Sequence, residues 1–246
     1  MEKRFRQARP GWFRAFKRLL VFIYKKPRFA YLGEPLGNGG IILSNHVGSH
    51  APLTLELYCD KPIRFWGASE MNSGLISVYK YLSRIYFHQK KHWNLHLARL
   101  LSLVAAPIIN IFYKGLRLIP TYRDARFLRT LNESLRAIRA GDNIVIFPED
   151  SSDGYHDELT GFLTGFGMLC DFCHRAKIDV PIYVTYFRKK DLTYVVDAPI
   201  RYSELCATGA TREEIAERLL GRCNELGKLD PDALPPAKEE SPLRYG

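Results

Sequence analysis

Short apolar runs alternate with longer amphipathic segments along most of the chain, and this alternation constrains the fold more than any other feature. The runs at residues 41–43, 63–66 and 144–147 are typical of buried strands. The segments between them carry apolar residues at three- and four-residue steps, which predicts helices. Strands that alternate with helices favour a mixed, largely parallel sheet flanked by helices. The sequence therefore predicts the α/β class.

The remaining elements follow from the same periodicities and from local end signals. Asp124 is placed to cap a helix that has Phe127 on its apolar face and ends at Gly141. Thr211 and Glu214 form a capping-box pattern, which predicts the start of a last helix. Further strands are expected at residues 29–32, 116–120, 181–187 and 192–196, and further helices at 75–87, at 95–111 with a bend at its proline, and at 162–176.

The length of 246 residues suits one large domain better than two small ones. We expect a basic amphipathic helix over residues 1–27, followed by a single α/β domain over residues 28–228. Residues 229–246 are rich in proline and charge, so a loose C-terminal tail is expected there.

The N-terminal segment combines an aromatic, apolar face with many basic residues. This combination is typical of an interfacial helix on anionic lipid. It is equally typical of a helix that packs on its own domain and has a solvated outer face. The apolar residues at helical spacing are Trp12, Phe13, Phe16, Leu19, Leu20 and Ile23.

The formal net charge of +10 predicts an anionic partner. Membrane headgroups, nucleic acid and a phosphorylated substrate all satisfy this condition. No sequence motif for nucleic-acid recognition accompanies the charge. We therefore expect an anionic membrane surface as the partner and no nucleic acid.

The cysteines and the hydropathy pattern bear on the compartment. The five cysteines are scattered and odd in number, and no secretory signal precedes them, which predicts a reducing compartment. No uninterrupted apolar stretch reaches 18 residues, so no transmembrane helix is expected. The nearest candidate, residues 100–113, is interrupted by Ser102, Pro107 and Asn110. These observations predict a cytoplasmic protein that associates peripherally with a membrane.

Two patterns contain residues that can bind a haem or a metal ion, but neither predicts such a site. Residues 170–174 match the c-type haem attachment pattern, yet they fall in a predicted helix of a chain without an export signal. His88, His92 and His96 have the four-residue spacing of one helix face, but the basic residues between them are typical of a solvated turn. No metal and no cofactor are predicted.

Polar residues follow several of the predicted strands, where open α/β sheets place their sites. After the first strand of the predicted core come Asn45 and His46, and a histidine at a strand end suits general-base catalysis. Taken alone, a histidine in this position more often serves only to hold a loop. The segment 180–184 is a strand start that alone carries no functional information.

Two further strand ends carry charged side chains. Arg123 follows the short strand at residues 116–120 and Arg117 lies within it, and an arginine just past a strand end suits fork-like binding of a phosphate. Glu149 and Ser151 follow the strand at residues 144–147 and place a carboxylate and a hydroxyl in a turn. A surface charge and a polar turn are the alternative interpretations.

Taken together and in this order, the four segments resemble the motif series of the glycerolipid acyltransferases of the lysophosphatidic acid acyltransferase type. The resemblance covers roughly residues 40–187, and its specific parts are the Asn-His and Phe-Pro-Glu elements. It implies membrane-surface acyl transfer from a thioester of coenzyme A or acyl carrier protein to a lysophospholipid hydroxyl, as in phospholipid biosynthesis.

The resemblance also assigns roles to residues. His46 is the implied base and Glu149 helps to shape the acceptor site. Arg123 holds the acceptor phosphate and Arg117 is a secondary phosphate ligand. Asn45 and Ser151 complete the set as candidate substrate-binding residues, and no metal takes part.

One position departs from the family pattern, because Ala51 stands where the family has an aspartate five residues after the histidine. That aspartate orients the imidazole, and loss of such a role costs about 10⁴-fold in rate in the serine protease template. Either another group orients His46, or the alanine was introduced to hold an inactive form, or the protein binds lipid without catalysis. The candidate orienting groups are Asp150, Glu149, Glu56 and His50.

The turn after the glutamate also departs from the family pattern. Asp150, Ser151 and Ser152 stand where the family commonly has Gly-Thr-Arg. A second carboxylate disfavours a phosphate at this place, which leaves a neutral or cationic acceptor open.

Overall fold

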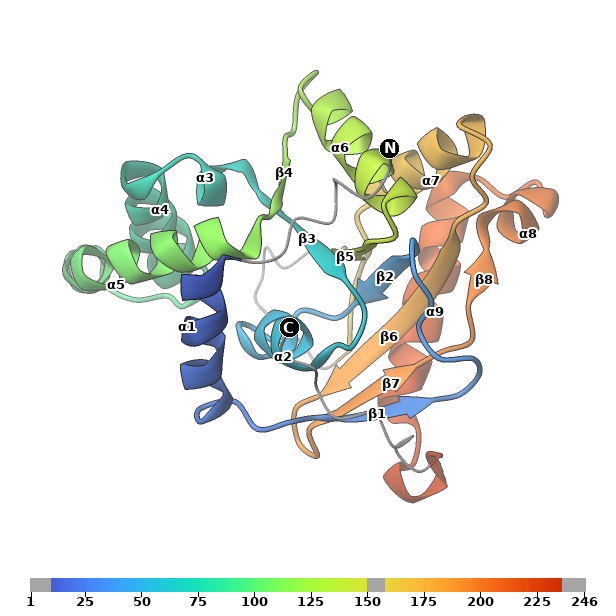
Figure 1. Cartoon of the computed structure of the whole chain (residues 1–246), viewed down its shortest axis with the longest axis horizontal. Helices are drawn as coiled ribbons and strands as arrows, with labels where there is room; N and C mark the ends of the chain where they lie inside the picture. Colours follow the sequence, from blue (N-terminus) through green and yellow to red (C-terminus); the bar gives the residue numbers. More distant parts are fainter. Residues whose placement is uncertain (1–9, 150–157, 236–246) are drawn as a thin grey trace.

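One mixed sheet of eight strands forms the centre of the computed structural model, which describes residues 10–149 and 158–235 (Figure 1). The strand order is β1-β7-β6-β2-β5-β3-β4, and β8 pairs with β6. Only β7 and β8 run antiparallel to their neighbour β6 among these pairings. The strands are β1 Arg28–Tyr31, β2 Ile41–Ser44, β3 Ile63–Ala68, β4 Ile119–Thr121, β5 Asn143–Ile146, β6 Pro181–Arg188, β7 Thr193–Val196 and β8 Ile200–Arg201. The predicted α/β class with a mixed, largely parallel sheet is confirmed.

Helices connect these strands and cover the sheet. The α-helices are α1 Gly11–Val21, α2 His50–Tyr58, α3 Ser69–Asn72, α4 Leu75–Lys80, α5 Leu95–Leu116, α6 Phe127–Arg139, α7 Gly165–Arg175, α8 Tyr202–Ala207 and α9 Arg212–Lys228. A π-helical segment, η2 (Tyr81–Lys90), continues α4, and a short 3₁₀ turn, η3 (Pro231–Ala233), follows α9. The capping box predicted at Thr211 and Glu214 forms at the start of α9.

The alternation of side chains along β2 divides the core into two layers. Ile41 and Leu43 face a cluster that contains buried residues of α6, α7 and α9. Ile42 faces a second cluster, to which α1 contributes Phe13 and α2 contributes Leu55. Because successive strand residues point to opposite faces, β2 is buried on both sides. This central position holds the residues that follow β2 on a rigid support.

Several elements differ from the sequence-based expectations, among them α3, α8 and β8, which were not predicted. The helix α2 was not predicted, because its buried apolar residues give no clear helical stripe. The helix expected at residues 75–87 is divided into α4 and the π-helical η2. The helix expected at 95–111 continues to Leu116 and includes Pro107 in its interior.

Helix α5 also changes the conclusion about membrane segments. It is the one helix in the described residues that is long and apolar enough, by length and composition, to cross a membrane. The sequence analysis passed over this helix as a candidate, because it looked for an uninterrupted apolar run. Ser102 breaks that run in sequence, but its hydroxyl donates to the carbonyl of Ala98 within the helix at 2.7 Å.

Helix α1 packs closely against the C-terminal end of α5. Phe13 is wholly buried and its ring lies 5.6 Å from that of Phe112. Gly115 allows this approach, since a Cβ atom at position 115 would lie 2.0 Å from a ring carbon of Phe13. The inner face of the N-terminal helix therefore packs on its own domain.

Replacing Gly115 with alanine is expected to destabilise the protein by about 1–3 kcal/mol, the usual cost of overpacking a filled core. The added methyl group collides with the Phe13 ring and forces α1 away from α5. The urea midpoint of unfolding measures the effect. Gly221→Ala in α9 is the matched control, because nothing lies within 4 Å of its added Cβ. Equal midpoints for the two variants would contradict the packing of α1 on α5.

After α9 the chain remains packed on the domain as far as Pro235. Leu234 is buried in the main core cluster, and the Arg28 guanidinium donates to the carbonyls of Leu234 and Pro235. The first part of the expected tail, up to Pro235, is therefore packed. Residues 236–246 lie outside the described residues, as do residues 1–9 of the expected N-terminal helix.

Candidate active site

The carboxyl ends of two neighbouring parallel strands bring His46 and Glu149 together. His46 follows β2, and Glu149 follows β5, the strand paired with β2. The backbone N–H of His46 donates a hydrogen bond to Oε2 of Glu149 at 2.9 Å. Glu149 is buried, and its backbone forms an antiparallel bridge with Phe162. Two motif segments that are distant in sequence are thereby joined at one edge of the sheet.

The imidazole of His46 lies against an aromatic ring at the mouth of the site. It is half-buried, and its ring centroid lies 4.8 Å from that of Phe147 in an edge-to-face arrangement. Two residues later Gly48 has a positive φ of 54°, which suits glycine. A Cβ at Gly48 would meet nothing within 4 Å, so the turn beside His46 is open.

Asn45 ties this turn to the neighbouring strand β6. Its Nδ2 donates to the carbonyl of Phe187 at 3.1 Å, and its Oδ1 accepts the Phe187 backbone N–H at 2.7 Å. The buried amide thus continues the β2–β6 ladder beyond the end of β2. The hydrogen bonds fix the position of the residue that precedes His46.

Ala51 lies in the first turn of α2 and is wholly buried. Its methyl group belongs to the apolar cluster on the α1 and α2 side of the sheet. Its carbonyl accepts a hydrogen bond from the hydroxyl of Tyr194 and another, at 3.2 Å, from that of Thr54. Burial raises the pKa of Tyr194, so this hydroxyl stays a neutral donor. Sequence analysis missed Thr54 and Tyr194, which no motif marks.

The groups proposed to orient His46 have other contacts. Glu149 accepts from the backbone of His46, as described above. Glu56 is buried and its carboxylate pairs with Lys17 of α1 at 3.2 Å. His50 lies against the ring of Tyr24, and burial, with a smaller effect of Lys189, lowers its pKa. Asp150 and Ser151 lie outside the described residues.

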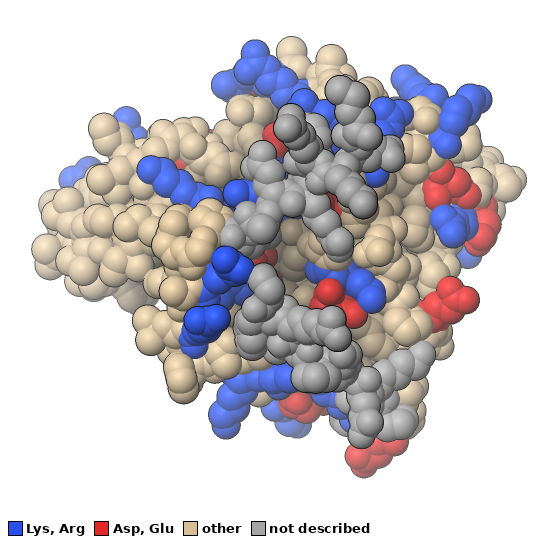
Figure 2. All heavy atoms as spheres, in the orientation of Figure 1, with Lys and Arg blue, Asp and Glu red and all other residues tan. Residues whose placement is uncertain are grey.

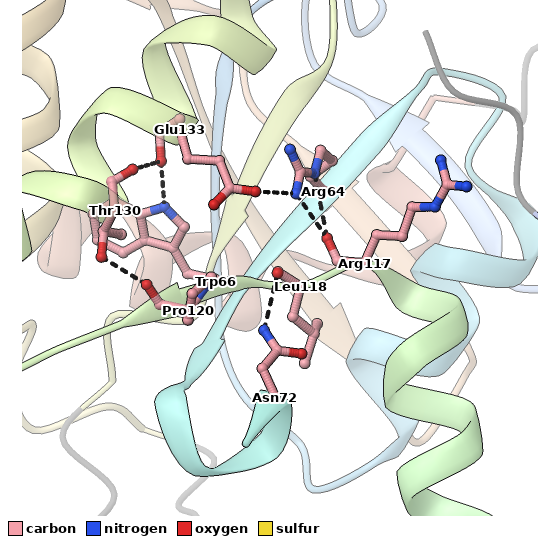
Figure 3. A network of polar contacts seen from close by, with 9 residues as sticks. Arg64, Trp66, Asn72, Arg117, Leu118, Pro120, Thr130 and Glu133 are labelled. Atoms are coloured by element: carbon pink, nitrogen blue, oxygen red, sulfur yellow. Dashed lines mark hydrogen bonds and ion pairs between the residues drawn. The ribbon is translucent and has the colours of Figure 1, made fainter. Parts of the chain in front are cut away.

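Arg123 is exposed just beyond the carboxyl end of β4. Since β2, β5, β3 and β4 run parallel, this end lies at the same edge of the sheet as the carboxyl end of β2. Helix α6 fixes the strand, because Thr130 Oγ1 donates to the carbonyl of Pro120 at 2.6 Å. The hydroxyl and amide contacts that hold β4 are drawn in Figure 3. Arg123 thus extends from a well-supported strand end.

Arg117 lies at the opposite end of β4. It closes α5 in the left-handed conformation, with a φ of 52°. Its carbonyl accepts two hydrogen bonds from the guanidinium of Arg64, which also pairs with Glu133 at 2.6 Å. Figure 3 shows the Arg117 side chain extending away from this network. The two candidate phosphate ligands therefore flank a strand of three residues instead of lying side by side.

The buried thiols are unsuited to nucleophilic catalysis. Burial, together with the nearby charge of Glu149, raises the pKa of Cys223 to about 12. Burial likewise raises the pKa of Cys173 to about 12. A thiol is nucleophilic as the thiolate, so both groups stay inert near neutral pH. Within residues 10–149 and 158–235, no cluster of histidine, cysteine and carboxylate side chains forms a metal site.

Comparisons with known proteins give a structural likeness but no match in sequence. No model of a known protein family matches the sequence, and no curated protein matches it. The crystal structure of the 1-acyl-sn-glycerophosphate (LPA) acyltransferase PlsC from Thermotoga maritima is similar to this chain, with 12% sequence identity and a TM-score of 0.49. The match covers 88% of this chain and 77% of that one.

Proposed function

We propose that this protein is an acyltransferase that moves a fatty acyl group from a thioester to the hydroxyl of a lysophospholipid or a related acceptor. The donor is acyl-coenzyme A or acyl carrier protein. His46 acts as the general base, and Glu149 and Asn45 position it. Arg123 binds the acceptor headgroup, with Arg117 and Ser151 as further candidate ligands.

The observation that carries this proposal is the hydrogen bond from the His46 backbone to the Glu149 carboxylate. It joins the two specific elements of the acyltransferase-like motif series at one edge of the sheet. A carboxylate used in this way fixes the backbone of the base, whose half-buried imidazole lies against the ring of Phe147. Both residues follow central, buried strands, which provide the rigid support that a catalytic geometry needs.

The proposed chemistry balances without a metal or a cofactor. The imidazole removes the proton of the acceptor hydroxyl as its oxygen attacks the thioester carbonyl. An ester C–O bond forms and the C–S bond breaks, so that the thiolate leaves. The imidazolium then returns its proton to the thiolate sulfur, and a free thiol is released with the acylated lipid.

We place this reaction at an anionic membrane surface on the cytoplasmic side, with the protein attached peripherally. The net charge of +10 supports this location. Helix α1 supports it as well, because Arg14 and Arg18 are exposed on the same helix as Trp12 and Leu19. An exposed face of this composition suits binding to the interface of an anionic membrane.

Thiol release tests the proposal directly. The protein is incubated with acyl-coenzyme A or acyl carrier protein donors, and with lysophosphatidic acid or neutral lysolipids as acceptors. Release that depends on the acceptor, together with formation of the acylated lipid, is the expected result. Absence of both products with every donor and acceptor, from this protein and from Ala51→Asp alike, would overturn the proposal.

A second candidate function is lipid binding without efficient catalysis. The observation that favours it is Ala51, since the position of the family aspartate is filled by a buried methyl group. Acceptor-independent binding of acyl-coenzyme A, with thiol release only from Ala51→Asp, would establish this function.

Arg123→Gln is expected to raise the KM for lysophosphatidic acid by about tenfold and to leave the KM for a neutral lysolipid unchanged. A charge-assisted hydrogen bond at an exposed site supports an effect of this size. Arg126→Gln is the matched control, because its guanidinium is bound to Asp124 at 2.7 Å. Equal effects of the two variants on the KM would show that Arg123 contributes only general surface charge and does not bind the headgroup specifically.

A further inference from the structure

Helix α5 has its large apolar side chains outside and its small side chains inside. Ala98, Ser102 and Ala106 are buried, and they recur at four-residue steps on the face toward α4 and η2. On the outer face Val104 is 70% exposed and Leu100 is 63% exposed. The exposed apolar residues of the helix are Leu97, Leu100, Leu101, Leu103, Val104, Ile108 and Ile111. A helix in water has the opposite arrangement, whereas small residues at helix contacts are typical of packing in lipid.

The positive charge of the surrounding segment is complementary to an anionic surface. No acidic residue occurs between Glu70 and Asp124, a stretch that includes α4, η2 and α5. The same stretch contains several lysines and arginines, of which Arg99 and Lys114 are exposed on α5 itself. Figure 2 shows the lobe where Figure 1 places α4 and α5 as mostly uncharged, with blue side chains among and around it. An uncharged face with basic borders suits acyl chains beneath anionic headgroups.

Helix α1 extends this surface. No acidic residue occurs between Glu2 and Glu34, so the two long acid-free stretches of the chain meet where Phe13 and Phe16 contact Phe112. While these rings hold α1 on α5, the outer residues of α1 and of the turn after it remain exposed. They are Trp12, Leu19, Phe22 and Ile23. We define the α5 face as the exposed apolar residues of α5, and α1 lies beside it.

We propose that α5 lies in the plane of an anionic membrane, with the α5 face inserted among the acyl chains of one leaflet. The helix does not cross the bilayer, because its inner face packs along α4 and η2 and its last turn packs on Phe13. The inference rests on the proposed function only for its membrane location, and it adds a specific inserted element apart from the N-terminal helix. A second copy of the chain fits the α5 face less well than a membrane does. The basic residues that border the two α5 faces would then lie close together and repel one another, with no acidic residues nearby to pair with them.

Binding to vesicles tests the proposal without any measurement of activity. We expect Ile108→Glu to reduce sedimentation with vesicles of equal parts phosphatidylcholine and phosphatidylglycerol by at least about tenfold, as a charge placed among acyl chains is strongly disfavoured. Leu128→Glu on α6 is the matched control, because Leu128 is 55% exposed and Ile108 is 57% exposed. Equal binding of both variants would overturn the proposal, even where Phe22→Glu abolishes binding, since α1 alone would then account for docking.

A second measurement reports depth. A polarity-sensitive dye is attached to Ile108→Cys or Leu128→Cys, in a protein whose Cys59 and Cys206 are replaced by serine. Quenching of the dye at position 108, and not at 128, by quenchers on the lipid acyl chains is the expected result. Quenching at neither position would contradict insertion. Light scattering in the absence of lipid covers the alternative, because a dimer that Ile108→Glu dissociates would show that a second copy occupies the α5 face.

Discussion

His46→Ala is expected to reduce acceptor-dependent thiol release by about 10²-fold, the lower range of the contribution that a general base makes. The lower range applies because Ala51 supplies no carboxylate to orient the imidazole or to stabilise its charged form. The loss of rate is measured as thiol release and as product formation, with the acceptor that gives the highest rate. Added imidazole is expected to restore part of the rate, because it can occupy the space that the truncated side chain leaves.

His174→Ala is the matched control for the loss of a histidine. His174 is exposed on α7 and lies against Tyr202, outside the candidate site. It is expected to leave the rate unchanged. Unaltered release from His46→Ala would remove the base from the proposed mechanism. An unfolded His46→Ala protein is recognised by its circular dichroism, and His46→Gln then serves as the test, because it retains a polar side chain but no base.

Much of the fold follows from the sequence because β2, β3 and β5 are short apolar runs that local composition identifies. The capping box of α9 is likewise local, since both partners lie within one turn. Helix α2 escaped prediction for the opposite reason. It is buried on most sides through contacts with α1 and the sheet, so its sequence has no polar face to mark a helical period.

The candidate site is likewise predicted only in part by the sequence. The motif series predicts which strand ends carry His46, Glu149 and Arg123, and the parallel order of β2, β5, β3 and β4 explains why they share an edge. It does not predict which atoms meet. Glu149 contacts the backbone of His46, and Tyr194 reaches the carbonyl of Ala51 from a strand that comes much later in the chain. Contacts of this kind depend on strand register and side-chain direction, which sequence periodicity does not encode.

The α5 face shows a further limit of a composition rule. Counting uninterrupted apolar residues rejected residues 100–113, because Ser102 and Asn110 stand among them. In the helix both side chains are buried on the protein side, while the exposed face is apolar. The arrangement of residues around the helix, and not their run length, determines what the surface can contact.

Ala51→Asp is expected to raise acyl transfer by up to about 10⁴-fold, which corresponds to roughly 5.5 kcal/mol of activation free energy. Position 51 lies five residues after His46, in the first turn of α2, where the resemblance places the orienting carboxylate. A carboxylate beside the imidazole favours its charged form, so it raises the pKa of His46. Because the base must be neutral, the pH at which activity reaches half its maximum is expected to move upward. The pH dependence of kcat/KM measures both effects.

The gain must depend on His46 if the carboxylate acts through the imidazole. In the Ala51→Asp background, His46→Ala is therefore expected to remove the full gain in addition to the loss seen in the parent protein, since residues that act as a unit are non-additive. Ala51→Asn is the control for size, because it fills the same space without a charge. The fully buried site also predicts a cost, as an added carboxylate there lowers stability unless the imidazolium pairs with it. A folded Ala51→Asp protein without any gain in rate would show that the orienting role belongs to another group or that the site does not catalyse this reaction.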